Sequence, residues 1–174
     1  SIAGARYYFP LVQGVIDIGA ESSKAMKCAA NGKIVDFAAN DKCAGGAGIF
    51  LDTMSLLLQI DADDPKSMDM ITEQINITST CVVFAESEVV TLIHKGMNRF
   101  DIWRGINESI AERAFSLAAR IRASGKVALI GGIAKNPVFV SCFEKMSGYK
   151  LLIPTNAQFV NALGAAIYAR ESKK

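Results

Sequence analysis

The strongest local constraint in this sequence is Asn31-Gly32, which separates two strand-like runs at residues 24–29 and 33–38. Asn-Gly between such runs is the best short-range hairpin signal, because a two-residue turn needs positive φ at both positions. The run Gly14–Gly19 before them is apolar with a single acid, which predicts a buried strand. The sequence therefore predicts a chain that opens with an antiparallel three-strand meander.

The remainder of the chain predicts helices alternating with strands. Strands are expected at residues 126–130 and at about 150–153, where Pro154 ends the second one. Helical spacing of apolar residues, or a helix-start signal, predicts helices at about 49–59, 84–95 and 103–123, after Asn136-Pro137 and at 161–170. Without a repeat or linker, residues 1–174 are expected to form one α/β domain.

Composition excludes several classes of protein. The net charge of +2 predicts no nucleic-acid partner. No apolar run approaches the length of a membrane span, so no membrane partner is expected. Four cysteines in a chain without a signal-peptide pattern favour a reducing, cytoplasmic location over a disulfide framework.

Two glycine-containing turns are candidates for a phosphate or nucleotide site. In the first, Asp17 ends the predicted strand before Gly19 and Ala20, where backbone N–H groups could approach a phosphate and the carboxylate could hold Mg²⁺. In the second, Gly131-Gly132 follows another strand and would let a flat ligand lie against the backbone. Each turn alone is equally compatible with an ordinary connection.

Two cysteines stand directly before predicted helices. Cys43 precedes a glycine-rich helix start that could accept an anion, and Cys81 precedes the helix at about 84–95. A helix N-terminus favours a thiolate at both positions. Two cysteines are too few for a four-thiolate site in one chain, but two chains would supply four. Cys28 and Cys142 fall within a predicted strand and a predicted helix and are expected to be core residues.

Together these segments resemble one family over essentially the whole chain. The matching stretches are Asp17-Ile-Gly-Ala-Glu-Ser-Ser-Lys24, Asn40-Asp-Lys-Cys-Ala-Gly-Gly-Ala-Gly48, Ser79-Thr-Cys-Val-Val-Phe-Ala-Glu-Ser-Glu88, Gly131-Gly-Ile-Ala-Lys-Asn-Pro137 and Ala162-Leu-Gly-Ala-Ala166. They look like the BadF/BadG/BcrA/BcrD ATPases, which include activators of 2-hydroxyacyl-CoA dehydratases and ATPase subunits of benzoyl-CoA reductase.

The resemblance implies a fold and an activity. It implies a ribonuclease H-like half of the actin-like, sugar-kinase and heat-shock ATPase fold. It also implies hydrolysis of ATP to ADP with Mg²⁺, and a 4Fe–4S cluster shared between two chains of a homodimer or a paralogous heterodimer. The implied partners are a CoA-ester dehydratase or reductase, which receives a low-potential electron, and an electron donor such as ferredoxin or flavodoxin.

Site residues follow by position. Cys43 and Cys81 match the cluster ligands, and Asp17 is the candidate catalytic carboxylate. The expected nucleotide contacts are Gly19, Ala20, Gly45, Gly46, Gly48, Gly131, Gly132 and Lys135. The family usually has Gly-Gln-Asp where this chain has Ala20-Glu-Ser22, a departure that favours the reductase-type subunits.

The family's first phosphate motif has no counterpart before Gly14, so the chain is expected to be the C-terminal lobe of a two-lobed ATPase. On its own it is expected to be a weak ATPase. Two alternatives stay open: a sugar- or acid-kinase-like ATP-binding domain with structural cysteines, and a non-catalytic regulatory domain.

Overall fold

A four-stranded mixed sheet forms the centre of the computed structural model, which describes residues 1–40, 46–77 and 82–172. Strands β1 (Gly14–Ile18), β2 (Ser23–Cys28) and β3 (Ile34–Ala39) are antiparallel neighbours. Strand β4 (Val127–Ile130) pairs with β1 in parallel, which gives the order β3-β2-β1-β4. The predicted meander is therefore confirmed.

The β2–β3 turn differs from the predicted one. Gly32 has a φ of 85°, but Asn31 does not have positive φ. The N–H of Gly32 donates to the carbonyl of Ala29 at 2.8 Å, and the N–H of Ala29 donates to the carbonyl of Lys33 at 2.9 Å. These bonds enclose a three-residue loop in which Ala30 is the additional residue, so only the glycine needs the left-handed conformation.

The strand expected at residues 150–153 is reduced to one bridge. Leu152 donates to the carbonyl of Val127 at 2.9 Å and accepts from the N–H of Leu129 at 3.0 Å, beside β4. Pro154 has no N–H with which to continue the ladder. The prediction was right about the neighbour of this segment and wrong about the length of the pairing.

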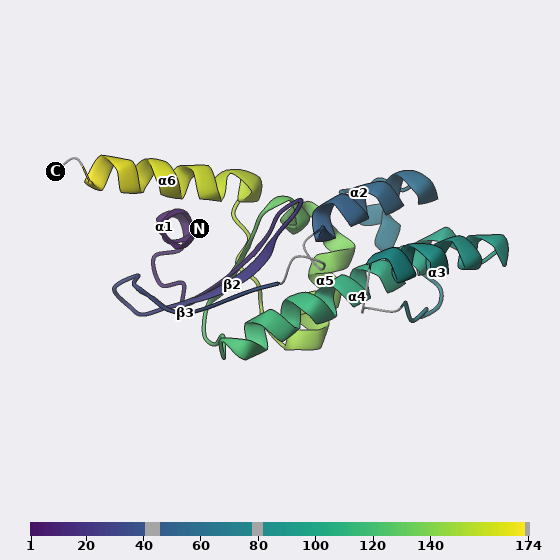
Figure 1. Ribbon diagram of the computed structural model, residues 1–174, viewed down its shortest axis with the longest axis horizontal. Helices are drawn as coiled ribbons and strands as arrows, with labels where there is room; N and C mark the ends of the chain where they lie inside the picture. Colours follow the sequence, from purple (N-terminus) through teal and green to yellow (C-terminus); the bar gives the residue numbers. More distant parts are fainter. Residues whose placement is uncertain (41–45, 78–81, 173–174) are drawn as a thin grey trace.

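Helices cover both faces of the sheet (Figure 1). One face carries α1 (Ile2–Tyr8) and α6 (Val160–Glu171), which pack together. The other face carries the larger set, in which α4 packs on β2 and β3 and is itself in contact with α5, α2 and α3. These helices are α2 (Ala47–Leu58), α3 (Val82–His94), α4 (Arg99–Arg120) and α5 (Pro137–Ser147). Short 3₁₀ helices lie at Pro65–Met68, Gly132–Lys135 and Ala157–Phe159.

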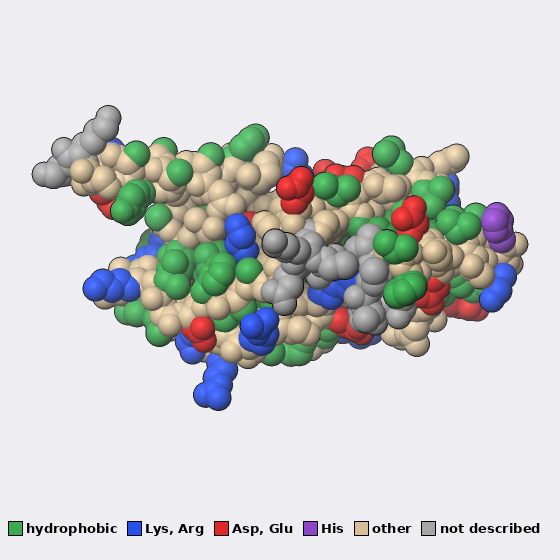
Figure 2. All heavy atoms as spheres, in the orientation of Figure 1, with side chains coloured by type: hydrophobic (Ala, Val, Ile, Leu, Met, Phe, Trp, Pro, Cys, Tyr) green, Lys and Arg blue, Asp and Glu red, His purple; other side chains and the backbone are tan. Residues whose placement is uncertain are grey.

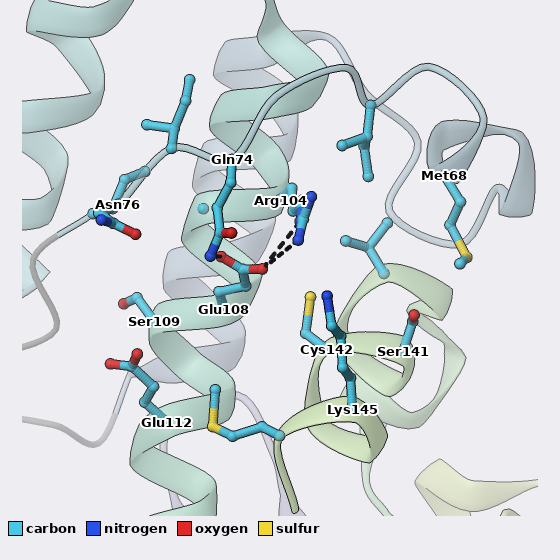
Figure 3. A pocket seen from close by; sticks show the side chains of 16 residues that line it. Met68, Gln74, Asn76, Arg104, Glu108, Ser109, Glu112, Ser141, Cys142 and Lys145 are labelled. Carbon is cyan, nitrogen blue, oxygen red and sulfur yellow. Dashed lines mark hydrogen bonds and ion pairs between the residues drawn. The ribbon is translucent and has the colours of Figure 1, made fainter.

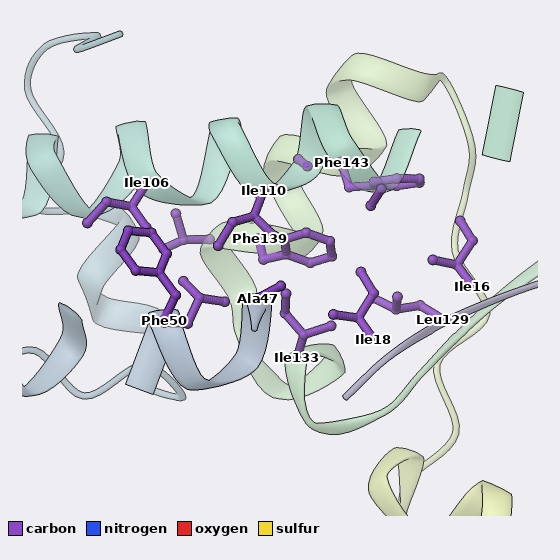
Figure 4. Close-up of a cluster of buried hydrophobic side chains, with 14 of the residues drawn as sticks. Ile16, Ile18, Ala47, Phe50, Ile106, Ile110, Leu129, Ile133, Phe139 and Phe143 are labelled. Carbon is purple, nitrogen blue, oxygen red and sulfur yellow. The ribbon is translucent and has the colours of Figure 1, made fainter. Parts of the chain in front are cut away.

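The side chains of β1 contribute to two separate cores. Val15 packs under α1 and α6, whereas Ile16 and Ile18 pack under α4 and α5 (Figure 4). Phe139 and Ile110 meet them from α5 and α4. Because both faces are covered, β1 is apolar along nearly its whole length instead of alternating.

The start of α5 agrees with the helix-start signal. The side-chain oxygen of Asn136 accepts from the N–H groups of Val138 and Phe139 at 3.0 and 3.1 Å, and Pro137 takes the first helical position. The amide nitrogen of Asn136 donates to Asn107 on α4 at 2.8 Å. This buried bond fixes the segment that follows β4 against the helix layer.

Strand β3 is the edge of the described sheet and is largely exposed. Ile34, Val35 and Phe37 leave more than half of their surface in solvent. Figure 2 shows apolar side chains gathered over this part of the sheet. Among the helices that the structure describes, none combines the length and apolarity required to cross a bilayer.

Candidate nucleotide site

The two predicted glycine turns lie side by side at one end of the sheet. In the parallel register Asp17 is opposite Ile130, so β1 and β4 end at the same level. Gly131 follows with a φ of 95°, and a Cβ there would collide with the backbone carbonyl of Ile18. Its N–H donates to the carbonyl of Ala157 at 3.0 Å. Only glycine fits this position, and its role is to let β4 turn closely past β1.

Gly132 and Lys135 face outward from the same turn. Within the described residues, a Cβ at Gly132 would meet no heavy atom within 4 Å, so the space beside it is open there. Lys135 ends the 3₁₀ helix that begins at Gly132, and its side chain is exposed. The open space fits the predicted approach of a nucleotide, and the contact itself stays a prediction.

The start of α2 is placed against the first glycine turn. A Cβ at Gly48 would lie 2.6 Å from the carbonyl oxygen of Gly19 and 2.7 Å from Cα of Ala20. The N–H of Ile49 donates to the carbonyl of Ala20 at 3.1 Å. At Gly46, the N-cap of α2, a Cβ would meet no heavy atom of the described residues within 4 Å. The structure therefore brings together two motifs that are separated in the sequence.

Asp17 is 5% exposed and lies on the face covered by α1 and α6. Its Oδ2 accepts from the hydroxyl of Ser1 at 3.0 Å and from Nδ2 of Asn161 at 2.9 Å. Within the described residues Oδ1 has no hydrogen bond, and Lys24 is the direct cross-strand neighbour of Asp17. One carboxylate oxygen is thus fixed by the protein and the other is available. No sequence pattern indicated the contact with Asn161.

The predicted cluster ligands Cys43 and Cys81, and Gly45, lie outside the described residues. Helix α3 begins at Val82, directly after Cys81, and α2 begins at Ala47, four positions after Cys43, so each cysteine precedes a helix in the sequence. No group of three or more His, Cys, Asp or Glu residues suited to a metal ion occurs in the described part of the chain. The assignment of Cys43 and Cys81 as cluster ligands stays a prediction.

The other two cysteines have structural surroundings. The thiol of Cys28 donates to the carbonyl of Val12 at 3.2 Å, and burial raises its pKa. Burial, with a smaller contribution from the nearby Glu108 carboxylate, raises the pKa of Cys142 to about 11. Both thiols are protonated at neutral pH, in keeping with the predicted core roles.

A separate groove of about 800 Å³ lies between α4, α5 and residues 68–77 (Figure 3). Arg104 and Glu108 form an ion pair of 2.9 Å in it, and Nε2 of Gln74 donates to the Glu108 carboxylate at 3.3 Å. Lys145 and Cys142 line the α5 side. Of the predicted site residues that the structure describes, none lines this groove, and sequence patterns gave no indication of it.

Solved structures define the class of protein. The chain matches the activator of the 2-hydroxyisocaproyl-CoA dehydratase from Clostridium difficile, solved with bound ADPNP, at a TM-score of 0.90 and 35% identity over 99% of this chain and 66% of that one. Component A of the Acidaminococcus fermentans (R)-2-hydroxyglutaryl-CoA dehydratase gives a TM-score of 0.90 at 36% identity, over 99% and 67% of the two chains. The ethanolamine utilization protein EutJ from Carboxydothermus hydrogenoformans (TM-score 0.59, 17% identity, 96% and 53% covered) shares the fold alone. The fold is that of the actin-like and heat-shock ATPases, as predicted.

The family follows from the sequence comparison. The chain belongs to the BadF/BadG/BcrA/BcrD ATPase family, whose model matches residues 2–169. It is 37% identical to the 2-hydroxyisocaproyl-CoA dehydratase activator of Clostridioides difficile, over 98% of this chain and 65% of the relative. It is 40% identical to the (R)-2-hydroxyglutaryl-CoA dehydratase activating ATPase of Acidaminococcus fermentans, over 95% and 64%. The chain thus spans slightly less than two thirds of the length of these relatives.

A benzoyl-CoA reductase polypeptide of Thauera aromatica is 28% identical, over 95% of this chain and 61% of that protein. Overall identity is therefore higher with the dehydratase activators than with this reductase component. The substitutions at Ala20–Ser22 had favoured the reductase type, and whole-chain identity does not support that preference.

Proposed function

We propose that this chain is the C-terminal lobe of an ATPase that activates a CoA-ester dehydratase or reductase. It binds ATP and ADP with Mg²⁺ at the ends of β1 and β4, and holds half of a 4Fe–4S cluster through Cys43 and Cys81. A second ATPase subunit, identical or paralogous, supplies the other half. Electrons arrive from a donor such as ferredoxin or flavodoxin and leave to the dehydratase or reductase.

The open end of the sheet supports the nucleotide assignment. Gly131 and Gly132 follow the carboxyl end of β4, beside the end of β1, where ligands bind in open α/β sheets. The N-terminus of α2 adds a positive dipole end, which favours phosphate, and its N-cap Gly46 makes no side-chain cap hydrogen bond within the described residues.

Asp17 fits a Mg²⁺ ion. It is a buried carboxylate with one oxygen fixed by hydrogen bonds and the other without a partner among the described residues. Hard cations prefer carboxylate and water oxygens, so Asp17 would hold Mg²⁺ directly or through water. Mg²⁺, when bound, supplies positive charge that neutralises the phosphates during hydrolysis.

The close contact between the start of α2 and the Gly19–Ala20 turn is the main observation that supports the proposal. Gly48 permits this close approach, and Ile49 donates to the carbonyl of Ala20 at 3.1 Å. Only three residues separate Cys43 from the first residue of α2. A phosphate-dependent movement of the turn would therefore displace α2 and the cysteine before it. A kinase-like domain with structural cysteines has no need of this connection.

Anaerobic reconstitution with iron and sulfide tests the proposal. Cys43→Ser and Cys81→Ser should each abolish stable iron binding and absorption near 400 nm. Cys28→Ser and Cys142→Ser are matched controls and should keep both, since those thiols pack in the fold. Iron binding that requires Cys28 or Cys142 and tolerates loss of Cys43 would reject the cluster assignment. Nucleotide binding without any cluster would favour the kinase-like alternative.

A further inference from the structure

Residues 157–161, at the start of the last helical segment, contact both halves of the candidate nucleotide site. The carbonyl of Ala157 accepts from the N–H of Gly131 at 3.0 Å, in the turn after β4. Four residues later, Nδ2 of Asn161 donates to Oδ2 of Asp17 at 2.9 Å, at the end of β1. One short segment therefore bonds to the glycine turn and to the candidate catalytic carboxylate.

The position of Asn161 is fixed by the packing of α6. Helix α6 packs across α1 above the sheet (Figure 1). A Cβ at Gly4 would collide with the carbonyl of Val160, and a Cβ at Gly164 would lie 3.0 Å from the backbone nitrogen of Gly4. Val160 is itself 1% exposed. These contacts leave the first turn of α6 little freedom to move, so Asn161 reaches Asp17 from a rigid base.

The bond from Asn161 selects the oxygen that Asp17 presents. Without it, the carboxylate could rotate about its terminal torsion, which is broad for aspartate. The hydroxyl of Ser1 also donates to Oδ2 at 3.0 Å, so both donors restrain the same oxygen. With Oδ2 occupied, Oδ1 is left for a cation or its water.

We propose that Asn161 is a positioning residue that orients the Asp17 carboxylate for a magnesium nucleotide. This inference rests on the proposed nucleotide site. The two hydrogen bonds of this segment, from Gly131 to Ala157 and from Asn161 to Asp17, would also hold the glycine turn and the carboxylate at a fixed distance from each other. A bond whose role is only to anchor α6 would affect stability and leave the magnesium dependence of nucleotide binding unchanged.

The test measures ADP affinity by calorimetry with Mg²⁺ and with EDTA. Asn161→Leu keeps the size of the side chain and removes the donor. It should lower the magnesium-dependent gain in ADP affinity about tenfold. This is the lower end of the range for loss of a hydrogen bond to a charged group, because the hydroxyl of Ser1 still donates to Asp17. Asn98→Leu is the matched control, because Asn98 is also exposed and makes one helix-capping bond, to Phe100 at 2.9 Å. This control should lose stability and keep the magnesium-dependent gain.

The exchange Asp17→Asn/Asn161→Asp distinguishes a bond that only anchors α6 from one that orients the Asp17 carboxylate. It reverses the direction of the hydrogen bond, so thermal stability should stay close to that of the unaltered chain. It also moves the charge from β1 to α6, so the magnesium-dependent gain should stay lost. An unchanged gain in Asn161→Leu would overturn the inference and leave the proposed function intact. A full gain in the exchanged variant would overturn both the inference and the magnesium role proposed for Asp17. Absence of ADP binding by the unaltered chain would overturn both.

Discussion

Gly48→Ala should disturb the contact between α2 and the candidate phosphate turn. The new methyl group would lie 2.6 Å from the carbonyl oxygen of Gly19 and 2.7 Å from Cα of Ala20, well inside the 3.4 Å at which ordinary contact begins. Both neighbours are backbone atoms, so neither can rotate away. The helix or the turn therefore has to move.

The expected cost follows from two opposing effects. Overpacking of this kind costs about 1–3 kcal/mol. The greater helix propensity of alanine recovers at most about 1 kcal/mol. We expect a net loss of about 1–2 kcal/mol, or a fall of roughly 2–8 °C in Tm for a chain of this size. Because α2 is displaced from the turn, ADP affinity should also fall.

Urea and thermal unfolding measure the stability of Gly48→Ala, and calorimetry measures its ADP affinity. Gly46→Ala is the matched control two residues earlier. Gly46 has a φ of −87°, and a Cβ there would meet no heavy atom of the described residues within 4 Å, so alanine should change stability by no more than about 0.5 kcal/mol. Equal stability of the two variants would refute the close-approach argument.

Three further outcomes are expected. Gly132→Val should fold normally, since the space beside Gly132 is open, and should weaken ADP binding about tenfold, or about 1.4 kcal/mol; unchanged ADP affinity in calorimetry would contradict this. Burial raises the pKa of Asp101, but the hydrogen bonds that its carboxylate accepts from Glu73 and Thr72 outweigh that effect and hold the pKa below its ordinary value. Asp101→Ala should therefore lower the free energy of unfolding by about 2–3 kcal/mol at pH 7, and this loss should shrink as pH falls below about 4. An equal loss at pH 7 and pH 3, measured by urea unfolding, would argue against the prediction. Cys142, with a pKa of about 11, should react with iodoacetamide very slowly at pH 8 and much faster as pH approaches 11; rapid labelling at pH 7 would reject the burial argument.

Features that depend on neighbouring residues were predictable from the sequence. The meander, the helix start at Asn136 and the two glycine turns each rest on a few adjacent residues. That both turns lie at one end of the sheet was not predicted from either motif, because it depends on β1 and β4 pairing in parallel and ending together. The short pairing at Leu152 was less predictable, since its length depends on where Pro154 stands relative to β4.

Contacts between distant segments could not be read from local patterns. Asp17 and Asn161 are 144 residues apart, and their hydrogen bond depends on how α6 packs on α1. The glycine at position 48 indicated a helix start, but only the folded chain shows that it allows α2 to approach the turn at Gly19. The groove at Arg104 and Glu108 likewise arises from three segments meeting in space.

The exposed edge of β3 has a consequence for how this protein behaves at high concentration. An edge strand with apolar side chains such as Val35 and Phe37 is a template for pairing with other chains and hence for aggregation. Asp36 lies between them, and its carboxylate accepts from the N–H of Phe37 at 2.8 Å. That N–H cannot pair with an incoming strand at the same time, and the charge opposes stacking of identical edges. Asp36 therefore acts as a gatekeeper against fibril-like association.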